Sequence, residues 1–256
     1  METISIANRK GGIGKTTFAV NISNELTQAG HLVLMIDLDS QCDLSKIYCQ
    51  GSGNQGDIMK LIQGECSLKE AVFKVKDNLH IIPGSEELIH LEDCEEDKLK
   101  EILAGDFFKE VDYVIIDHPP NINEAALQGF VASNEVLVVV EPEAFCVENI
   151  NSLLDDLYHI QFTMNSDLQI LGIAINRIDL RRNLTKSFIK KLDHTFKEEI
   201  FEARISNNTA VPTSLNERVP LRELEWRSKT VNQFQDLIKE MKERMVDNGD
   251  EQTQGE

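Results

Sequence analysis

Short apolar runs alternate with stretches of helical periodicity along most of the chain. Several runs are apolar throughout, as in Val114-Ile115-Ile116, which is typical of parallel strands buried on both faces. No internal repeat accompanies the alternation. The pattern predicts six strands: Thr3–Ala7, Leu32–Asp37, Leu79–Ile82, Tyr113–Asp117, Val136–Val140 and Ile170–Asn176.

The segment between the first two strands has the periodicity of an amphipathic helix. Its apolar residues share one face: Ala19, Ile22, Leu26 and Ala29. We predict a helix over Thr16–Ala29 that ends at Gly30. The strand–helix–strand order predicts an α/β fold, a single domain with a mostly parallel, twisted sheet flanked by helices on both faces. We expect this domain at residues 1–246 and a disordered acidic tail at 247–256.

Composition supports a globular domain. Of the 256 residues, 41% are hydrophobic, enough for a sizeable core. Five scattered cysteines without a CxxC pair predict reduced thiols in a cytoplasmic protein, rather than a disulfide framework or a zinc site. No apolar stretch approaches the ~20 residues needed to span a bilayer. The first residues also lack the pattern of a secretory signal.

The formal net charge of −18 sets a condition on any anionic partner. Nucleic acid or an anionic membrane would be repelled globally, so binding either one requires a local basic patch. Two polar segments are interpreted as solvent-facing. Gln50–Gly56 is a glycine-rich surface connection, and Glu86–Glu101 is an acidic, solvated helix or loop.

A glycine-rich segment follows the first strand and opens the first helix, which is the setting of a phosphate-binding loop. Its glycines allow backbone N–H groups to approach phosphate oxygens, and the helix N-terminus adds partial positive charge. We expect Lys15 to reach the β- and γ-phosphates and the Thr16 hydroxyl to bind Mg²⁺. The predicted nucleotide-binding residues of the loop are Gly11, Gly12, Ile13, Gly14, Lys15, Thr16 and Thr17.

Two further strands end in carboxylates. Asp37 and Asp39 close the second strand, and Asp117 closes the fourth. Ligands gather at the carboxyl ends of strands in open α/β sheets, so these acids are candidates for the same site as the glycine loop.

These three segments together resemble the ParA/MinD family of P-loop ATPases. Lys10–Thr17 is similar to the family's deviant Walker A loop, KGGxGK[ST]T. Asp37–Gln41 is similar to its D-x-D-P-Q motif, with Ser40 in place of proline, and Asp117 is similar to the Walker B aspartate. The resemblance covers about residues 2–245, with the strong motifs early in the chain.

The resemblance implies ATP as substrate, Mg²⁺ as cofactor and specific roles for several residues. Lys10 would reach across a dimer interface to the partner's phosphates, and Asp39 would position the attacking water. Asn176 would hydrogen-bond the adenine edge. His118, where a small residue is usual, is expected to play a hydrogen-bonding role. The implied catalytic residues are therefore Lys10, Lys15 and Asp39, and the implied metal-site residues are Thr16, Asp39 and Asp117.

For function, the resemblance implies an ATP-dependent homodimerisation switch with slow, partner-stimulated hydrolysis. ParA- or Soj-like members bind DNA nonspecifically as ATP dimers and partition plasmids or chromosomes with a ParB-like centromere-binding partner. A basic segment offers a DNA surface: Arg181, Arg182, Lys186, Lys190 and Lys191. However, Asn207 and Ala210 replace basic residues of an I-P-R-N-V-R segment common in such relatives. The location expected is cytoplasmic, and nucleoid-associated if DNA is bound.

Two alternatives stay open. A MinD-like positioning ATPase would act on membrane or protein cargo without binding DNA. The last helix carries an apolar stripe that includes Val231 and Phe234, but its polar face mixes acids with bases, so we expect it to pack onto the domain and expect no membrane partner. A metabolic kinase or synthetase would need an acceptor pocket, for which no motif is visible. Iron–sulfur relatives carry cysteine pairs that this sequence lacks.

Overall fold

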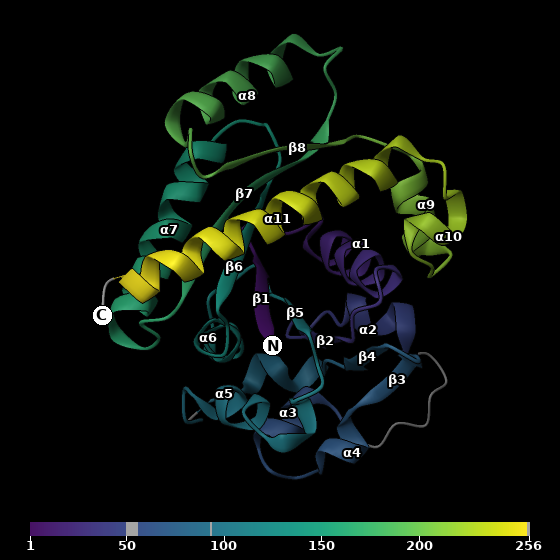
Figure 1. Cartoon of the computed structure of the whole chain (residues 1–256), viewed down its shortest axis with the longest axis vertical. Coiled ribbons are helices and arrows are strands. Elements are labelled where there is room, and N and C mark those ends of the chain that lie inside the picture. Colours follow the sequence, from purple (N-terminus) through teal and green to yellow (C-terminus); the bar gives the residue numbers. More distant parts are fainter. Residues whose placement is uncertain (50–55, 93, 255–256) are drawn as a thin grey trace.

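An eight-stranded sheet organises the chain in the computed structural model, which describes residues 1–49, 56–92 and 94–254 (Figure 1). The strand order is β3-β4-β2-β5-β1-β6-β7-β8, and neighbours are parallel except for the antiparallel pair β3–β4. The strands are β1 (Glu2–Ala7), β2 (Val33–Asp37), β3 (Phe73–Lys76), β4 (Leu79–Ile82), β5 (Tyr113–Asp117), β6 (Glu135–Val140), β7 (Gln169–Ile178) and β8 (Ile200–Ser206).

All six predicted strands are confirmed, with ends shifted by no more than two residues. The two strands missing from the prediction, β3 and β8, lie at the two edges of the sheet. Charged residues interrupt both, as in the Phe-Lys-Val-Lys sequence of β3, so neither shows the continuous apolar run of a central strand.

Helices connect the strands on both faces of the sheet. They are α1 (Lys15–Gln28), α2 (Asp43–Tyr48), α3 (Ile58–Ile62), α4 (Leu68–Ala71), α5 (Lys98–Leu103), α6 (Glu124–Val131), α7 (Cys146–Thr163), α8 (Asn183–Thr195), α9 (Ala210–Asn216), α10 (Leu221–Glu225) and α11 (Lys229–Gln254). Two short 3-10 helices, η1 (Glu86–His90) and η2 (Asp106–Phe108), complete the described elements.

Each central strand contributes side chains to two cores. In β2, Val33 and Met35 pack in a core with α1, α2 and α11, whereas Leu34 and Ile36 pack on the opposite face with α3 and α5. A third cluster, beneath α6, α7 and α8, includes Val136 and Val138 of β6. The sandwich of helices around a parallel sheet explains why the predicted strands are apolar throughout.

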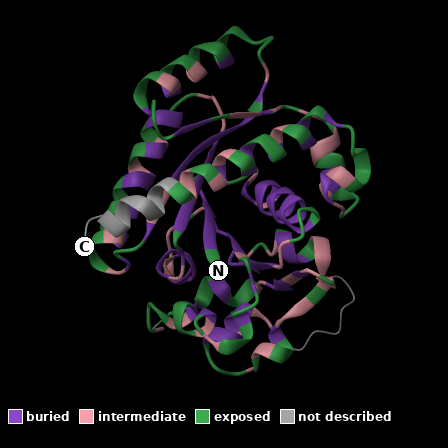
Figure 2. Cartoon of the chain, in the orientation of Figure 1, coloured by how far each residue is buried: buried purple, intermediate pink, exposed green. Residues whose placement is uncertain are grey.

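The first helix is enclosed by the C-terminal part of the chain. Phe18 of α1 meets Phe234 of α11 edge to face, with ring centroids 5.2 Å apart, and Arg222 of α10 contacts the Glu25 carboxylate. Figure 2 shows α1 as buried along its length, while α11 has an exposed outer side. The predicted packing of the last helix is confirmed, because its stripe, including Val231 and Phe234, lies in the core. None of the described helices is long and apolar enough to cross a membrane.

The sequence predicts three polar regions at the surface: an acidic segment, a glycine-rich loop and an acidic tail. The acids described in the Glu86–Glu101 segment are exposed around η1 and α5, as predicted. The predicted Gln50–Gly56 loop lies, apart from Gly56, outside the described residues. The predicted tail begins within α11, whose backbone is helical to Gln254. Side chains beyond residue 246 are outside the description, so the domain boundary and the disorder of the tail stay predictions.

Candidate nucleotide site

Three strand ends and one loop meet at the carboxyl edge of the sheet. In the parallel register, Asp117 of β5 stands between Ile6 of β1 and Asp37 of β2. The glycine loop leaves β1 at this point and leads into α1. The sheet topology therefore brings together the loop and the acidic strand ends that the sequence predicted for one site.

Two glycines give the loop its shape. Gly12 and Gly14 have φ values of 75° and 102°, in the left-handed region that side chains disfavour. A Cβ on Gly14 would also lie 2.5 Å from Nδ2 of Asn176, which donates a hydrogen bond to the Ile13 carbonyl at 2.7 Å. Gly11 differs, because a Cβ there would meet no atom within 4 Å. The loop is thus held against β7 at Gly14 and is open at Gly11.

Lys15 is the cation of the site. Its side chain is buried, and its Nζ lies 3.4 Å from the Lys10 carbonyl oxygen. Burial lowers the pKa of Lys15, and the nearby carboxylates of Asp117 and Asp39 oppose that effect. A polyanionic ligand beside Lys15 would offset the desolvation of its ammonium group.

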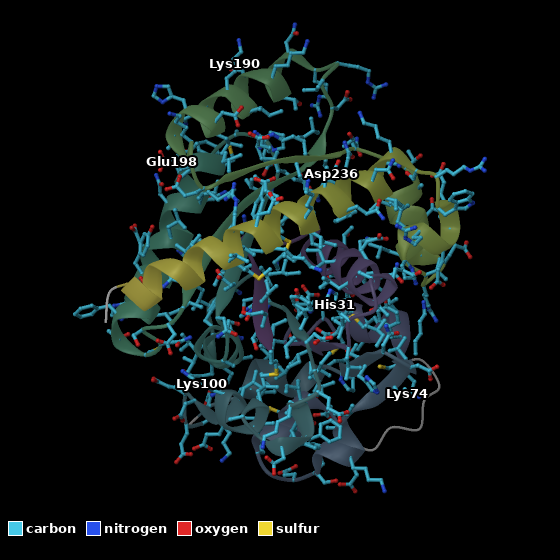
Figure 3. The ribbon with its side chains drawn as sticks, in the orientation of Figure 1. His31, Lys74, Lys100, Lys190, Glu198 and Asp236 are labelled. Atoms are coloured by element: carbon cyan, nitrogen blue, oxygen red, sulfur yellow. The ribbon has the colours of Figure 1, made fainter. Side chains whose placement is uncertain are left out.

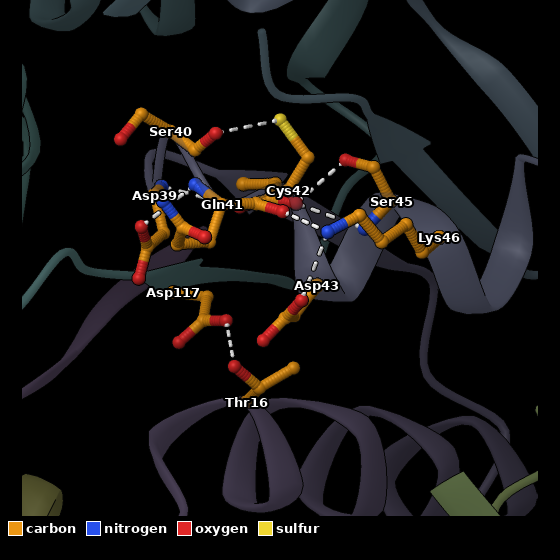
Figure 4. Close-up of polar contacts among 10 residues, drawn as sticks. Thr16, Asp39, Ser40, Gln41, Cys42, Asp43, Ser45, Lys46 and Asp117 are labelled. Carbon is orange, nitrogen blue, oxygen red and sulfur yellow. Dashed lines mark hydrogen bonds and ion pairs between the residues drawn. The ribbon is translucent and has the colours of Figure 1, made fainter. Parts of the chain in front are cut away.

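Asp117 is a buried carboxylate with only one oxygen engaged. Its Oδ2 accepts a hydrogen bond from Thr16 Oγ1 at 2.6 Å, and its Oδ1 has no hydrogen-bond partner among the described residues (Figure 4). Burial, followed by the charge of Asp37, raises the pKa of Asp117 well above its ordinary range. A divalent cation satisfies such an oxygen and stabilises the ionised form, and hydroxyl and carboxylate oxygens are ligands that Mg²⁺ accepts. The residues fit the predicted metal site.

Asp37 and Asp39 have different environments although they stand two residues apart at the end of β2 and just beyond it. Asp37 is fully buried and accepts hydrogen bonds from the Ser45 backbone N–H at 2.8 Å and hydroxyl at 2.6 Å. Burial raises the pKa of Asp37 to about 6. Asp39 is partly exposed, and its Oδ1 accepts from the Gln41 N–H at 3.0 Å. Asp37 therefore anchors the turn into α2, while Asp39 presents its carboxylate at the site.

The loop connecting β6 to α7 contributes two glutamates that form ion pairs beside the glycine loop. Lys10 forms an ion pair with Glu143, and Arg177 pairs with Glu141. Arg177 also donates to the Gly12 carbonyl at 2.7 Å. From the sequence, Arg177 belongs to the basic segment considered for DNA, and nothing in the linear order places it or the two acids beside residues 10–12.

A cavity of about 280 Å³ opens beside the loop and extends the site. Its lining includes Thr17, Asn176, Asn207, Val211, Pro212 and Leu215. Apolar side chains facing amides suit a flat heteroaromatic base. Both amide atoms of Asn176 are used internally, since its Oδ1 accepts from the Arg177 N–H at 2.8 Å and its Nδ2 holds Ile13. Its adenine contact stays a prediction. The apolar lining from α9 carries no sequence signal of a base pocket.

His118 is neutral and packed behind the site. Its Nε2 is 2.7 Å from the Ser5 hydroxyl, and its ring stacks on Phe130 at a centroid distance of 4.1 Å. Burial lowers the pKa of His118 to about 3. The predicted hydrogen-bonding role is confirmed.

The basic residues predicted to contact DNA lie on α8 and the turn before it. All five are exposed: Arg181, Arg182, Lys186, Lys190 and Lys191. Arg181 is held by the Asp179 carboxylate at 2.8 and 2.9 Å, and Lys191 pairs with Glu148 at 3.2 Å. Their contact with DNA stays a prediction.

Comparisons with known proteins identify the family of the chain. A family model described as an AAA domain matches residues 1–170. The chain is 28% identical to the chromosome-partitioning ATPase Soj of Treponema pallidum, covering 94% of this chain and 96% of that one. The MinD cell-division ATPase of Pyrococcus furiosus superposes with a TM-score of 0.78 at 25% identity, over 94% and 98% of the two chains. An ATP complex of Cyanothece McdA superposes with a TM-score of 0.82 at 23% identity, over 96% of each chain. The matched region contains the glycine loop and both acidic strand ends, and the chain belongs to the ParA/MinD family of P-loop ATPases.

Proposed function

We propose that this protein is a magnesium-dependent ATPase that works as a dimerisation switch in DNA partition. The observation that supports it most is the cluster of Lys15, Thr16 and Asp117 at the mouth of the glycine loop, with an unpartnered carboxylate oxygen where a metal ion would bind. The similarity to a chromosome-partitioning ATPase over nearly the whole chain supports DNA partition as the process in which it acts.

In the proposed reaction, the loop backbone and Lys15 bind the β- and γ-phosphates. A magnesium ion held by Thr16 and Asp117, with Asp39 close by, would supply neutralising charge to those phosphates. Asp39 accepts a hydrogen bond from the water in line with the γ-phosphate and thereby orients it. The cavity beside Thr17 takes the adenine base, where Val211 and Leu215 exclude water from its face.

Dimerisation brings Lys10 to the phosphates of the partner subunit. Two features of the single chain support this step. The Lys10 side chain is half-exposed, and Glu143 is its one ion-pair partner within the described residues, so it can exchange that partner for phosphate. A Cβ at Gly11 would meet no atom of the described residues within 4 Å, which leaves room for a second loop to approach. The second cation then adds charge stabilisation only in the closed dimer.

The closed dimer binds duplex DNA nonspecifically through the basic residues of α8 and the preceding turn. A ParB-like centromere-binding partner stimulates the slow hydrolysis, which separates the dimer and releases DNA. We place this cycle in the cytoplasm, on the nucleoid while ATP is bound. Phosphate contacts without base readout suit such a surface, because exposed lysines and arginines on a helix neutralise successive backbone charges.

The central test combines nucleotide binding with size-exclusion chromatography. Lys15→Ala should abolish ATP binding, because the phosphates lose their buried cation. Asp39→Ala should bind ATP and remain dimeric, since hydrolysis is blocked. Lys74→Ala, on the distant edge strand β3, is the matched control and should behave as wild type. An Asp39→Ala protein that stays monomeric with ATP and Mg²⁺ would refute the switch.

A second candidate, a MinD-like positioning ATPase without DNA binding, is favoured by the net charge of −18 and by the neutralisation of Arg181 by Asp179. Sedimentation with random duplex, with and without ATP, discriminates the two proposals. Salt-sensitive binding that weakens on replacing Arg182 and Lys186 supports partition. ATP-dependent dimerisation with no retention on DNA at low salt supports the second candidate.

A further inference from the structure

A break in the regular pairing of β7 lies beside the glycine loop. Between two paired positions, β7 advances three residues, from Ile175 to Ile178. Over the same distance β8 advances only two, from Arg204 to Ser206. The extra residue makes a β-bulge, and Arg177 within it has a φ of 51°. An arginine in the left-handed region is strained and persists only where its surroundings fix it, so the contacts of this bulge indicate what it does.

The bulge directs two consecutive side chains at the glycine loop. In a regular strand, consecutive side chains point to opposite faces of the sheet. Here Asn176 donates from Nδ2 to the Ile13 carbonyl at 2.7 Å. Arg177 donates from Nη1 to the Gly12 carbonyl, also at 2.7 Å. The end of β7 therefore holds two successive carbonyls of the loop.

These two side chains are themselves fixed in place. Asn176 is buried, and its Oδ1 accepts a hydrogen bond from the Arg177 N–H at 2.8 Å. The Arg177 guanidinium is held by Glu141, just beyond β6, whose Oε1 lies 2.5 Å from Nη1. Each loop carbonyl is thus bound by a side chain whose own position is set by a further contact.

Holding a carbonyl also sets the direction of the next N–H group. A peptide unit is planar and trans, so its C=O and N–H point in opposite directions. The contact of Arg177 with the Gly12 carbonyl therefore orients the Ile13 N–H, and the contact of Asn176 orients the Gly14 N–H. The latter donates to no backbone acceptor within the described residues. Both N–H groups face away from the end of β7.

The backbone of the loop has the alternation expected of an anion cradle. Gly12 and Gly14 are left-handed, and Ile13 between them is not. Such an alternation gathers successive N–H groups into a concavity that binds an anion. The two contacts from β7 act on the peptide units within this concavity.

We propose that Asn176 and Arg177 are positioning residues that hold the glycine loop in its phosphate-binding shape before the ligand arrives. The inference rests on the proposed ATPase function and deepens it. Asn176, which the resemblance assigns to the adenine edge, acts here on the phosphates through the loop backbone. Neither side chain has to touch a phosphate, because each acts through a carbonyl. Preorganised donors need no rearrangement when the anion binds, so losing them lowers the affinity for any ligand of the loop.

Recognition of the base by these residues predicts a different result. A residue that reads only adenine changes the affinity for ATP and leaves the affinity for a ligand without a base unchanged. A residue that orders the loop changes both affinities by the same factor. Inorganic tripolyphosphate carries the phosphates alone and is therefore the probe that separates the two roles.

Calorimetry on the full chain with Mg²⁺ measures both affinities. Arg177→Gly removes the guanidinium while the left-handed φ becomes favourable, so this variant should fold. We expect it to weaken ATP and tripolyphosphate by the same factor of about ten, the loss of one hydrogen bond from a charged donor. Asn176→Ala should weaken both ligands about fivefold, since its donor is neutral. Lys74→Ala removes an exposed cation from β3, at the edge of the sheet opposite β8, and should change neither affinity (Figure 3).

Amide NMR assigns each effect to its own peptide unit. With isotope-labelled glycine and isoleucine, tripolyphosphate should shift the amide signals of Gly14 and Ile13 in the wild type. Arg177→Gly should chiefly reduce the shift of Ile13. Asn176→Ala should chiefly reduce the shift of Gly14. A general loss of structure would reduce both shifts alike in each variant, and that result would overturn the proposal.

The calorimetric outcomes separate this inference from the proposed function. A lower affinity for ATP with unchanged affinity for tripolyphosphate would assign these residues to the base and overturn the proposal. Wild-type affinities in both variants would overturn it as well. A wild-type chain that binds neither ATP nor tripolyphosphate would overturn the proposed function itself.

Discussion

At the scale of single residues, the two ends of the glycine loop respond differently to an added methyl group. Gly14→Ala would place Cβ 2.5 Å from Asn176 Nδ2 at a φ of 102°, and a strained position of this kind costs about 1–3 kcal/mol. We expect a large loss of ATP affinity, measured by calorimetry. The Cβ of Gly11→Ala would meet no atom within 4 Å in the described part of the chain, so its monomer should bind ATP normally. Equal losses in both variants would contradict this account.

The same Gly11→Ala protein tests the approach of two loops. We expect it to bind ATP yet to dimerise poorly in size-exclusion chromatography, because the added methyl group occupies the space that the partner's loop requires. Normal dimerisation would show that the contact between subunits lies elsewhere.

The buried acid Asp37 predicts a pH dependence of stability in the metal-free protein. Its pKa is raised from 3.8 to about 6, chiefly by burial, so the folded state binds this proton more tightly than the unfolded state. The protonated Asp37 therefore stabilises the folded state fully below the unfolded pKa, and this stabilisation is lost as the pH rises through about 6. The free energy of unfolding falls by about 3 kcal/mol over that range. Burial acts in the same direction on Asp117.

Urea unfolding in a chelating buffer, at about pH 4 and about pH 7.5, measures this effect. The free energy of unfolding should fall with rising pH in the wild type and should fall less in Asp37→Asn. A wild-type stability that rises over this range would be the opposite sign and would exclude the assignment.

At the scale of elements, β8 is an edge strand whose free N–H groups are capped by α11. Glu240 accepts from the Glu202 N–H at 2.9 Å and from the Ala203 N–H at 3.1 Å. Glu240→Ala leaves these donors without their acceptor, and we expect a loss of about 2 kcal/mol or more in chemical unfolding. Glu243→Ala, one turn away and exposed, is the control and should change stability by less than about 0.5 kcal/mol. Equal effects would mean that α11 does not protect this edge.

The edges also show which elements a sequence can predict. Buried strands such as β5 are recognisable because both faces are covered, which makes them apolar throughout. β8 alternates buried Ile205 with the exposed or half-exposed residues Glu202 and Arg204, and its partners on α11 lie more than 25 residues later. Its polar residues are explained only once the capping helix is in place.

The nucleotide site likewise contains residues that the sequence predicts and residues that only the tertiary structure identifies. Lys15, Thr16 and Asp117 were predictable because the glycine turn and the apolar strand fix their chemistry locally. The separate roles of Asp37 and Asp39 depend on Ser45, which follows them in α2, and no spacing rule distinguishes the two acids. The cavity beside Thr17 combines residues from β7 and α9, so its apolar wall belongs to the tertiary structure alone.

At the scale of the whole molecule, the C-terminal helix completes the core behind the nucleotide site. Phe234 is 1% exposed and packs edge to face on Phe18, which stands three residues after Lys15 on the same helix. Truncating a buried phenylalanine costs about 3–5 kcal/mol. Phe234→Ala should therefore unfold at lower urea concentration, and ATP affinity should fall with it, because α1 is the element that carries the phosphate-binding lysine. Val246→Ala, 64% exposed on the same helix, should leave both quantities unchanged. Phe234→Ala could instead lose stability but bind ATP as tightly as the wild type. In that case α11 would stabilise the fold without positioning Lys15, and the expected link between its packing and ATP affinity would be wrong.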